Sequence, residues 1–125
     1  METTSLFERL GRSSGIERIV DEVAGRHLEN PVIAARFRPY LDQPRKLQAL
    51  KDHLARFLEM GSGGPHRYAG RDMRTTHAGM NISPAEYMAA VDDILAALTQ
   101  VGVDEQTRKD VLAMTWSLKG DIVHM

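Results

Sequence analysis

Apolar residues that recur every three or four positions are the feature of this sequence that most limits its fold. The clearest stripe has the spacing of an amphipathic helix and consists of Ile16, Ile19, Val20, Val23, Ala24, His27 and Leu28. Asn30-Pro31 follows this stripe and is expected to end the helix. A second stripe begins after Pro44 and consists of Leu47, Leu50, Leu54, Phe57 and Leu58.

The second half of the chain carries equally clear signals for helix starts. Ser83-Pro84-Ala85-Glu86 has the form of a capping box with proline in the first turn. Gly102 is expected to end the helix that follows, and Asp104 to begin the last one. No segment alternates as a half-buried strand does, so the sequence predicts an all-α fold.

Length and composition limit the classes of protein that remain. The chain has 125 residues, 42% of them hydrophobic, which predicts one domain over residues 1–125 with a core able to enclose a ligand. Sixteen basic residues against 17 acidic ones give no reason to expect nucleic acid or a membrane as partner. Without cysteine, any metal must be held by histidine, carboxylate or methionine. We expect a cytoplasmic protein that is a monomer or a weak homo-oligomer.

A glycine-rich stretch from Gly63 to His77 separates the two halves of the chain. It is too broken for a long helix, and loops of that length in a compact domain tend to be functional. Asp72 is expected to cap a short helix that carries Met73, His77 and Met80 on one side. An imidazole between two mobile apolar side chains suits a flat apolar cofactor, although His77 alone is also compatible with a surface histidine.

The same stretch resembles the signature of group I truncated haemoglobins. The resemblance is carried by Gly63-Gly64-Pro65, Tyr68, Gly70-Arg71-Asp72-Met73 and His77. Leu6–Gly11 resembles the opening of that family, and Phe37 its haem-contacting phenylalanine. The resemblance implies a truncated globin, a two-over-two helical sandwich around haem b (protoheme IX), with His77 as the proximal iron ligand. It also implies O2, CO or NO as ligands.

The resemblance further implies a set of haem contacts. They are Phe37, Leu50, Leu54, Phe57, Leu58, Tyr68, Met73, Thr76, Ile82, Tyr87 and Thr115. The distal side departs from the family. Ala24 stands where a tyrosine is common, and Leu54 where a glutamine is common. Each lost charge-assisted hydrogen bond removes roughly 1 to 3 kcal/mol of stabilisation from bound oxygen.

His53 is the polar candidate that remains on the distal side. It lies one turn from Leu50 and Phe57, and some members of the family use a histidine here as a sixth iron ligand. The alternative is a His53 side chain at the helix edge that points into solvent. The choice decides whether two imidazoles or one hold the iron.

Several other residues are expected to have structural roles or to be exposed, rather than to bind a ligand. We expect His27, His66 and His124 to be packed or exposed rather than ligands, and Trp116 to be a core residue. Met60, Met80, Met88 and Met114 are expected to fill the core. Arg67, Arg71 and Arg74 could reach haem propionates, but a solvated edge is favoured.

The sequence leaves three functions open. The first is reversible binding of a diatomic ligand at a haem iron held by His77. The second is redox chemistry, either NO dioxygenase-like detoxification or electron transfer and redox sensing through a two-histidine haem, with an unidentified reductant. The third, an interaction module that has lost its haem, is disfavoured because His77 and its flanking motif are retained.

Overall fold

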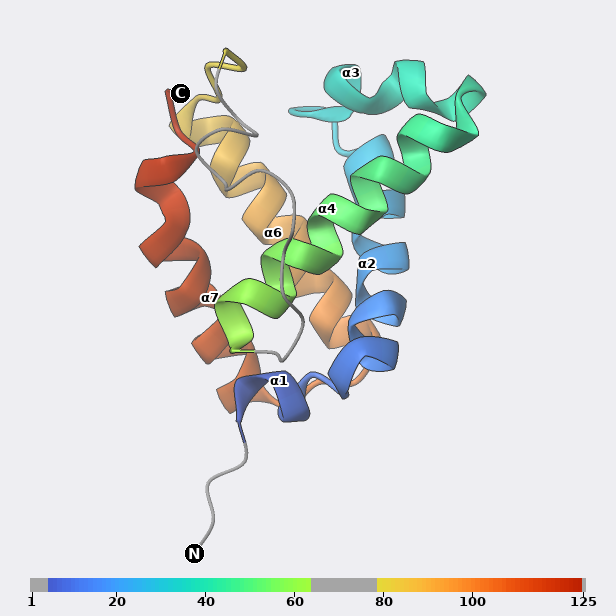
Figure 1. Cartoon of the computed structure of the whole chain (residues 1–125). Coiled ribbons are helices and arrows are strands. Elements are labelled where there is room, and N and C mark those ends of the chain that lie inside the picture. The colour runs from blue at the N-terminus through green and yellow to red at the C-terminus, as the bar shows by residue number, and fades with distance from the viewer. Residues whose placement is uncertain (1–4, 64–78, 125) are drawn as a thin grey trace, which may run out of the picture.

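Long helices from the two halves of the chain cross each other and enclose the core. The computed structural model describes residues 5–63 and 79–124. In these ranges α2 (Arg12–Glu29) packs against both α4 (Pro44–Ser62) and α6 (Pro84–Gln100). The last long helix, α7 (Glu105–Leu118), packs against α6 and α4. Figure 1 shows α4 crossing in front of α6, with α2 and α7 on either side.

Short elements connect the long helices. They are α1 (Leu6–Arg9), α3 (Ala34–Phe37) and the 3-10 helices η1 (Arg38–Asp42) and η2 (Lys119–Asp121). The described residues hold no strand beyond an isolated parallel bridge between Ile82 and Val123. The predicted all-α class is therefore confirmed. Within the same residues, no helix is both long and apolar enough to cross a membrane.

The predicted helix ends are confirmed. They were predictable because each is determined by residues that lie close to it in the sequence. Ser83 accepts a hydrogen bond from the Glu86 amide while the Glu86 carboxylate accepts one from the Ser83 amide, which completes the capping box. Asn30 ends α2, and Pro44 is the first residue of α4. Asp104 caps α7 through the Thr107 amide.

The predicted apolar stripes form one hydrophobic core. From α2 the buried residues include Ile16, Ile19, Val20 and Val23, and from the other long helices Leu58, Ile94, Leu98, Val111 and Met114. The last long helix, α7, ends at Leu118, and Ile122, which follows η2, is also buried.

Two expectations from the sequence, the core tryptophan and the core methionines, are wrong. Trp116 is not a core residue, since 58% of it is exposed and the Lys119 ammonium lies 4.2 Å from its ring centroid. Met60, Met80 and Met88 are exposed too, and of the four methionines expected in the core only Met114 is buried.

Gly15 occupies a crowded position near the start of α2. It lies inside α2, which already begins at Arg12 because Gly11 adopts a left-handed conformation. A Cβ at position 15 would lie 2.2 Å from the carbonyl oxygen of Leu10. Backbone cannot move away as a flexible side chain can, so this close approach requires glycine.

We predict opposite effects for two glycine substitutions in α2. Gly15→Ala should lower the free energy of unfolding by about 1 to 3 kcal/mol, because the added methyl group collides with Leu10. Gly25→Ala, with no atom near its new methyl group, should raise it by about 0.5 to 1 kcal/mol. Urea unfolding of both variants measures this, and a stabilised Gly15→Ala protein would contradict the packing described.

Candidate functional site

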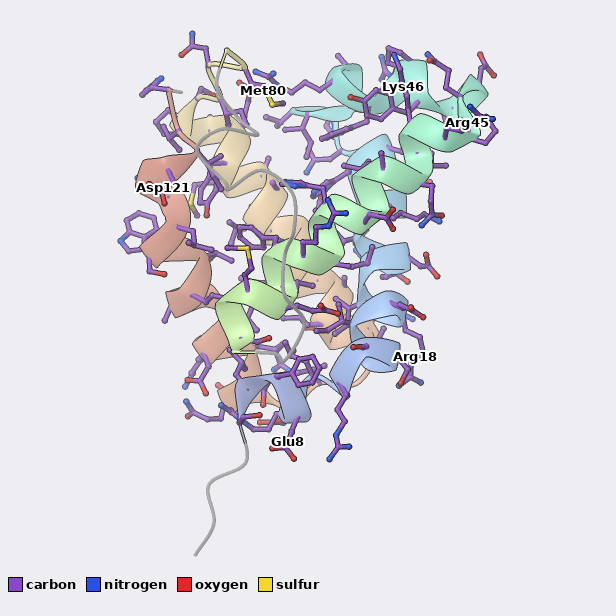
Figure 2. All side chains as sticks on the ribbon, viewed as in Figure 1. Glu8, Arg18, Arg45, Lys46, Met80 and Asp121 are labelled. Carbon is purple, nitrogen blue, oxygen red and sulfur yellow. The ribbon has the colours of Figure 1, made fainter. Side chains whose placement is uncertain are left out.

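An apolar cavity of about 460 Å³ lies between the end of α2, the segment from α3 to η1, the first half of α4, and α6. Its volume is in the range of small-molecule and cofactor pockets. Figure 2 shows Lys46 and Met80, two of its lining residues, near the top of the view. The apolar and aromatic part of the lining consists of Ile33, Phe37, Tyr40, Ala49, Leu50, Leu54, Phe57, Met80, Ile82, Tyr87, Ala90, Val91, Ile94 and Ile122.

One wall is the apolar face of α4. Leu50, Leu54 and Phe57 line the cavity at the spacing of one helical face, and His53 lines it with them. Phe57 is buried, whereas Leu50, His53 and Leu54 are half-buried. The side chains of this face therefore leave space that no other described residue fills.

The opposite wall carries a buried polar cluster. His27 is 3% exposed, and its Nδ1 lies 2.7 Å from Oδ2 of Asp93 on α6. The Asn30 amide donates to both carboxylate oxygens of Asp93, at 3.1 and 3.2 Å. On its flat side, the His27 ring stacks on Phe37, with centroids 5.5 Å apart and 17° between the planes.

Burial and the carboxylate act in opposite directions on His27. Removal from water lowers the pKa of its imidazole, and the hydrogen bond and charge of Asp93 offset part of this effect. The imidazole is therefore neutral at neutral pH. Its Nδ1 then carries the proton and donates it to Asp93, which leaves Nε2 as a hydrogen-bond acceptor.

An ion pair connects two helices at the rim of the cavity. The Arg36 guanidinium donates to both carboxylate oxygens of Glu86 and, at 3.1 Å, to the carbonyl of Met80. The Arg36 hydrogen bond, followed by that of the Ser83 amide, lowers the pKa of Glu86 to about 2. Glu86 is thus ionised at neutral pH and joins α3 to the start of α6.

Tyr87 connects the cavity to α7. It lines the cavity, and its hydroxyl donates a hydrogen bond to the main-chain carbonyl of Thr115. Burial raises the pKa of Tyr87 to about 12, so this hydroxyl stays protonated and remains a donor. Thr115 therefore supports the cavity from behind rather than lining it.

The residues predicted from the sequence fall into three groups. Phe37, Leu50, His53, Leu54, Phe57, Ile82 and Tyr87 line the cavity. Leu58, Thr115 and Ala24 are buried but are not among its lining residues. Tyr68, Met73, Thr76 and His77 lie outside the described residues.

The sequence did not single out the pair of His27 and Asp93. His27 was visible as a polar residue on the apolar stripe of α2, and Asp93 as a carboxylate among apolar neighbours in α6. A polar residue on a buried face needs a hydrogen-bonding partner, so the two positions together carried a signal. Nothing in a single sequence connects two residues 66 positions apart.

Comparison with known proteins identifies the family. The profile of the bacterial-like globin family matches residues 5–124. The Group 1 truncated hemoglobin GlbN of Nostoc sp. (strain MUN 8820) is 29% identical over 121 residues, which cover 97% of this chain and 98% of that protein. The chain therefore belongs to the bacterial-like globin family.

Solved structures agree on the fold. The crystal structure of truncated hemoglobin from Tetrahymena pyriformis in its Fe(III) form superposes with a TM-score of 0.87 at 20% identity, over 98% of this chain and 100% of that one. The 2/2 hemoglobin from Synechococcus sp. PCC 7002, solved in the cyanomet state with covalently attached heme, gives 0.77 at 22% identity, over 96% and 98%. The predicted two-over-two truncated globin fold is confirmed.

Proposed function

We propose that this globin holds haem b in the cavity between α2, α4 and α6 and binds a diatomic ligand, O2, CO or NO, at the haem iron. The observation that carries the proposal is the cavity itself, in a chain whose family and fold are those of truncated hemoglobins. The iron of the haem supplies the vacant coordination position at which such a ligand binds.

The residues of the cavity suit a flat, largely apolar group with two carboxylates. Leu50, Leu54 and Phe57 offer one apolar face along α4, and Phe37 offers an aromatic side chain. At the rim, Lys46 is a cation that lines the cavity and can pair with a carboxylate, whereas the other lining cation among the described residues, Arg36, is already paired with Glu86. Ile82 and Tyr87 complete the contacts that we assign to haem.

His77 is the proximal ligand in this proposal. Support comes from its sequence setting, because the motif around it resembles that of truncated haemoglobins. Met73, Tyr68 and Thr76 are assigned contacts with haem on the same grounds, and Leu58 and Thr115 act from the layer behind the cavity. His77 donates an electron pair from a neutral imidazole, as globin iron requires.

His53 is the distal group that we assign to the vacant side of the iron. Its side chain lines the cavity, between two leucines that also line it, which favours this role over a purely solvent-exposed one. With haem bound as proposed, the imidazole of His53 would be able to ligate the iron and to compete there with an external ligand. The observed ligand binding would then depend on dissociation of His53 from the iron as well as on the affinity of the iron for the ligand.

Two positions that carry hydrogen-bond donors for bound oxygen in the truncated haemoglobins that this chain resembles have lost them here. Ala24 and Leu54 carry no hydrogen-bond donor in their side chains, and Leu54 lines the cavity. Fast ligand release follows. Of the redox alternatives, NO dioxygenase-like detoxification uses bound oxygen and is weakened by the same two replacements, whereas electron transfer or redox sensing uses the two imidazoles of His53 and His77. Neither gains separate support, and the reductant, the cytoplasmic location and the oligomeric state stay predictions.

Removing the imidazole of position 77 should release the haem. We expect His77→Ala to retain haem far more weakly than the unaltered protein, because the iron loses its protein ligand. Transfer of haem to an excess of a haem-scavenging protein measures the rate of loss. His124→Ala, which removes an exposed histidine bonded to Asn81 outside the cavity, is the matched control. Equal retention in both variants would overturn the proximal assignment.

The ferric absorption spectrum tests His53. The unaltered protein should show the low-spin spectrum of a two-histidine haem, and His53→Leu should convert it to a high-spin spectrum, because leucine fills similar space without an electron pair. A high-spin spectrum that is identical in both proteins would show that His53 does not ligate iron.

A further inference from the structure

His27, a lining residue of the cavity, has a second ring nitrogen to which no described residue donates or accepts a hydrogen bond. His27 is 3% exposed, Nδ1 is committed to Asp93, and the ring face is covered by Phe37. Among the described residues no further hydrogen bond to the imidazole is found. A buried polar atom without a partner is costly, so Nε2 is expected to serve a group that enters the cavity.

The residues around His27 determine whether its Nε2 accepts or donates a hydrogen bond, and therefore which molecules it can bind. Asp93 is held in place by two bonds from Asn30, and Asn30 is itself anchored because its side-chain oxygen accepts from the Val32 amide at 3.0 Å. A fixed carboxylate at Nδ1 selects the tautomer in which Nε2 bears the lone pair. The wall therefore presents an acceptor, whereas O2, CO and NO carry no proton to share.

We propose that His27 is the proton acceptor for small protic molecules that bind in this cavity, with Asp93 and Asn30 as its positioning residues. The molecules in question can give up a weakly acidic hydrogen, as hydrogen cyanide, hydrogen sulfide and hydrogen peroxide do. This inference rests on the proposed function, because such molecules bind as anions at the iron. It adds a second class of ligand to the diatomic gases.

The step requires no oxidant or reductant. The bond between the guest and its acidic hydrogen breaks, the guest keeps both electrons of that bond, and the proton forms a new bond to Nε2 of His27. The imidazolium that results lies 2.7 Å from the Asp93 carboxylate, which stabilises its charge. The pair thus replaces water as the destination of the proton in a buried site.

Burial keeps His27 unprotonated in the resting protein, which is the form that can accept a proton, and the hydrogen bond and charge of Asp93 offset part of the basicity that burial removes. Because removal from water lowers the pKa of His27, the imidazole is neutral before the guest arrives and has a free lone pair. The charged groups that also line the cavity are Arg36, Lys46 and Glu86. Arg36 and Glu86 neutralise each other at the rim, so Asp93 is the carboxylate in direct contact with His27.

The test compares hydrogen cyanide with carbon monoxide. At neutral pH hydrogen cyanide is protonated and must lose its proton to bind ferric iron, whereas carbon monoxide binds ferrous iron without proton transfer. Both association rates are measured in His53→Leu protein, where the sixth position is vacated, and in the same protein carrying His27→Gln. Glutamine can still donate to Asp93 but is not a base.

We expect His27→Gln to slow cyanide association about 100-fold, the lower end of the effect of a positioned proton acceptor. Carbon monoxide association should not change, and His124→Gln should alter neither rate. If His27→Gln slowed the association of cyanide and of carbon monoxide to the same extent, the cavity would be damaged and the inference overturned. Equal cyanide rates with and without His27 would also overturn it. A protein that binds neither ligand would instead refute the proposed function.

A spectroscopic measurement does not depend on ligand rates or on the stability of a variant. Nitrogen-15 NMR of the histidines distinguishes a protonated Nδ1 from a protonated Nε2, in the haem-free chain and in the diamagnetic carbonmonoxy form. We expect His27 to carry its proton on Nδ1 in both. A proton on Nε2 in either form would remove the acceptor and overturn the inference.

Discussion

The hydrogen bond between His27 and Asp93 is the interaction on which the geometry of the cavity depends. It joins the last turn of α2 to the middle of α6, and Asn30 adds two bonds to the same carboxylate where the chain leaves the helix. Phe37 stacks on the imidazole and is thereby held over the cavity. A carboxylate in so buried a place requires hydrogen-bond donors, so loss of His27 would leave Asp93 with Asn30 as its donor among the described residues.

The same crossing of helices explains why a cavity exists at all. α2 packs on α6 and α4, but Leu50 and Leu54 line the cavity and stay half-buried. Apolar surface left partly exposed in this way is stabilised when a flat apolar group covers it. Binding of haem therefore adds to the stability of the folded chain by mass action.

Much of the fold was predictable because its signals are local. The capping box at Ser83 and Glu86 and the stripe from Ile16 to Val23 each determine a helix within a few residues. Trp116 could have been placed correctly too. Val111, Thr115 and Leu118 define the inward face of α7, and a residue directly after Thr115 points away from it.

The candidate site was predictable only in part. Leu50, His53 and Leu54 follow from helical spacing combined with the family resemblance, and the structure finds them on one cavity wall. The role of His27 could not be read from its own neighbours, because it depends on Asp93 from another helix. Likewise, the need for glycine at position 15 depends on a carbonyl group whose position exists only in the folded chain.

Stoichiometric binding of haem in the cavity between α2, α4 and α6 is the central claim, and titration of the haem-free protein with haemin tests it most directly. The unaltered chain should saturate at one haem per chain. Ala90→Trp, which fills the cavity from α6, should keep its helical content and show no such saturation, because indole takes the space of the cofactor. Equal saturation of both proteins, or none in the unaltered chain, would contradict the claim.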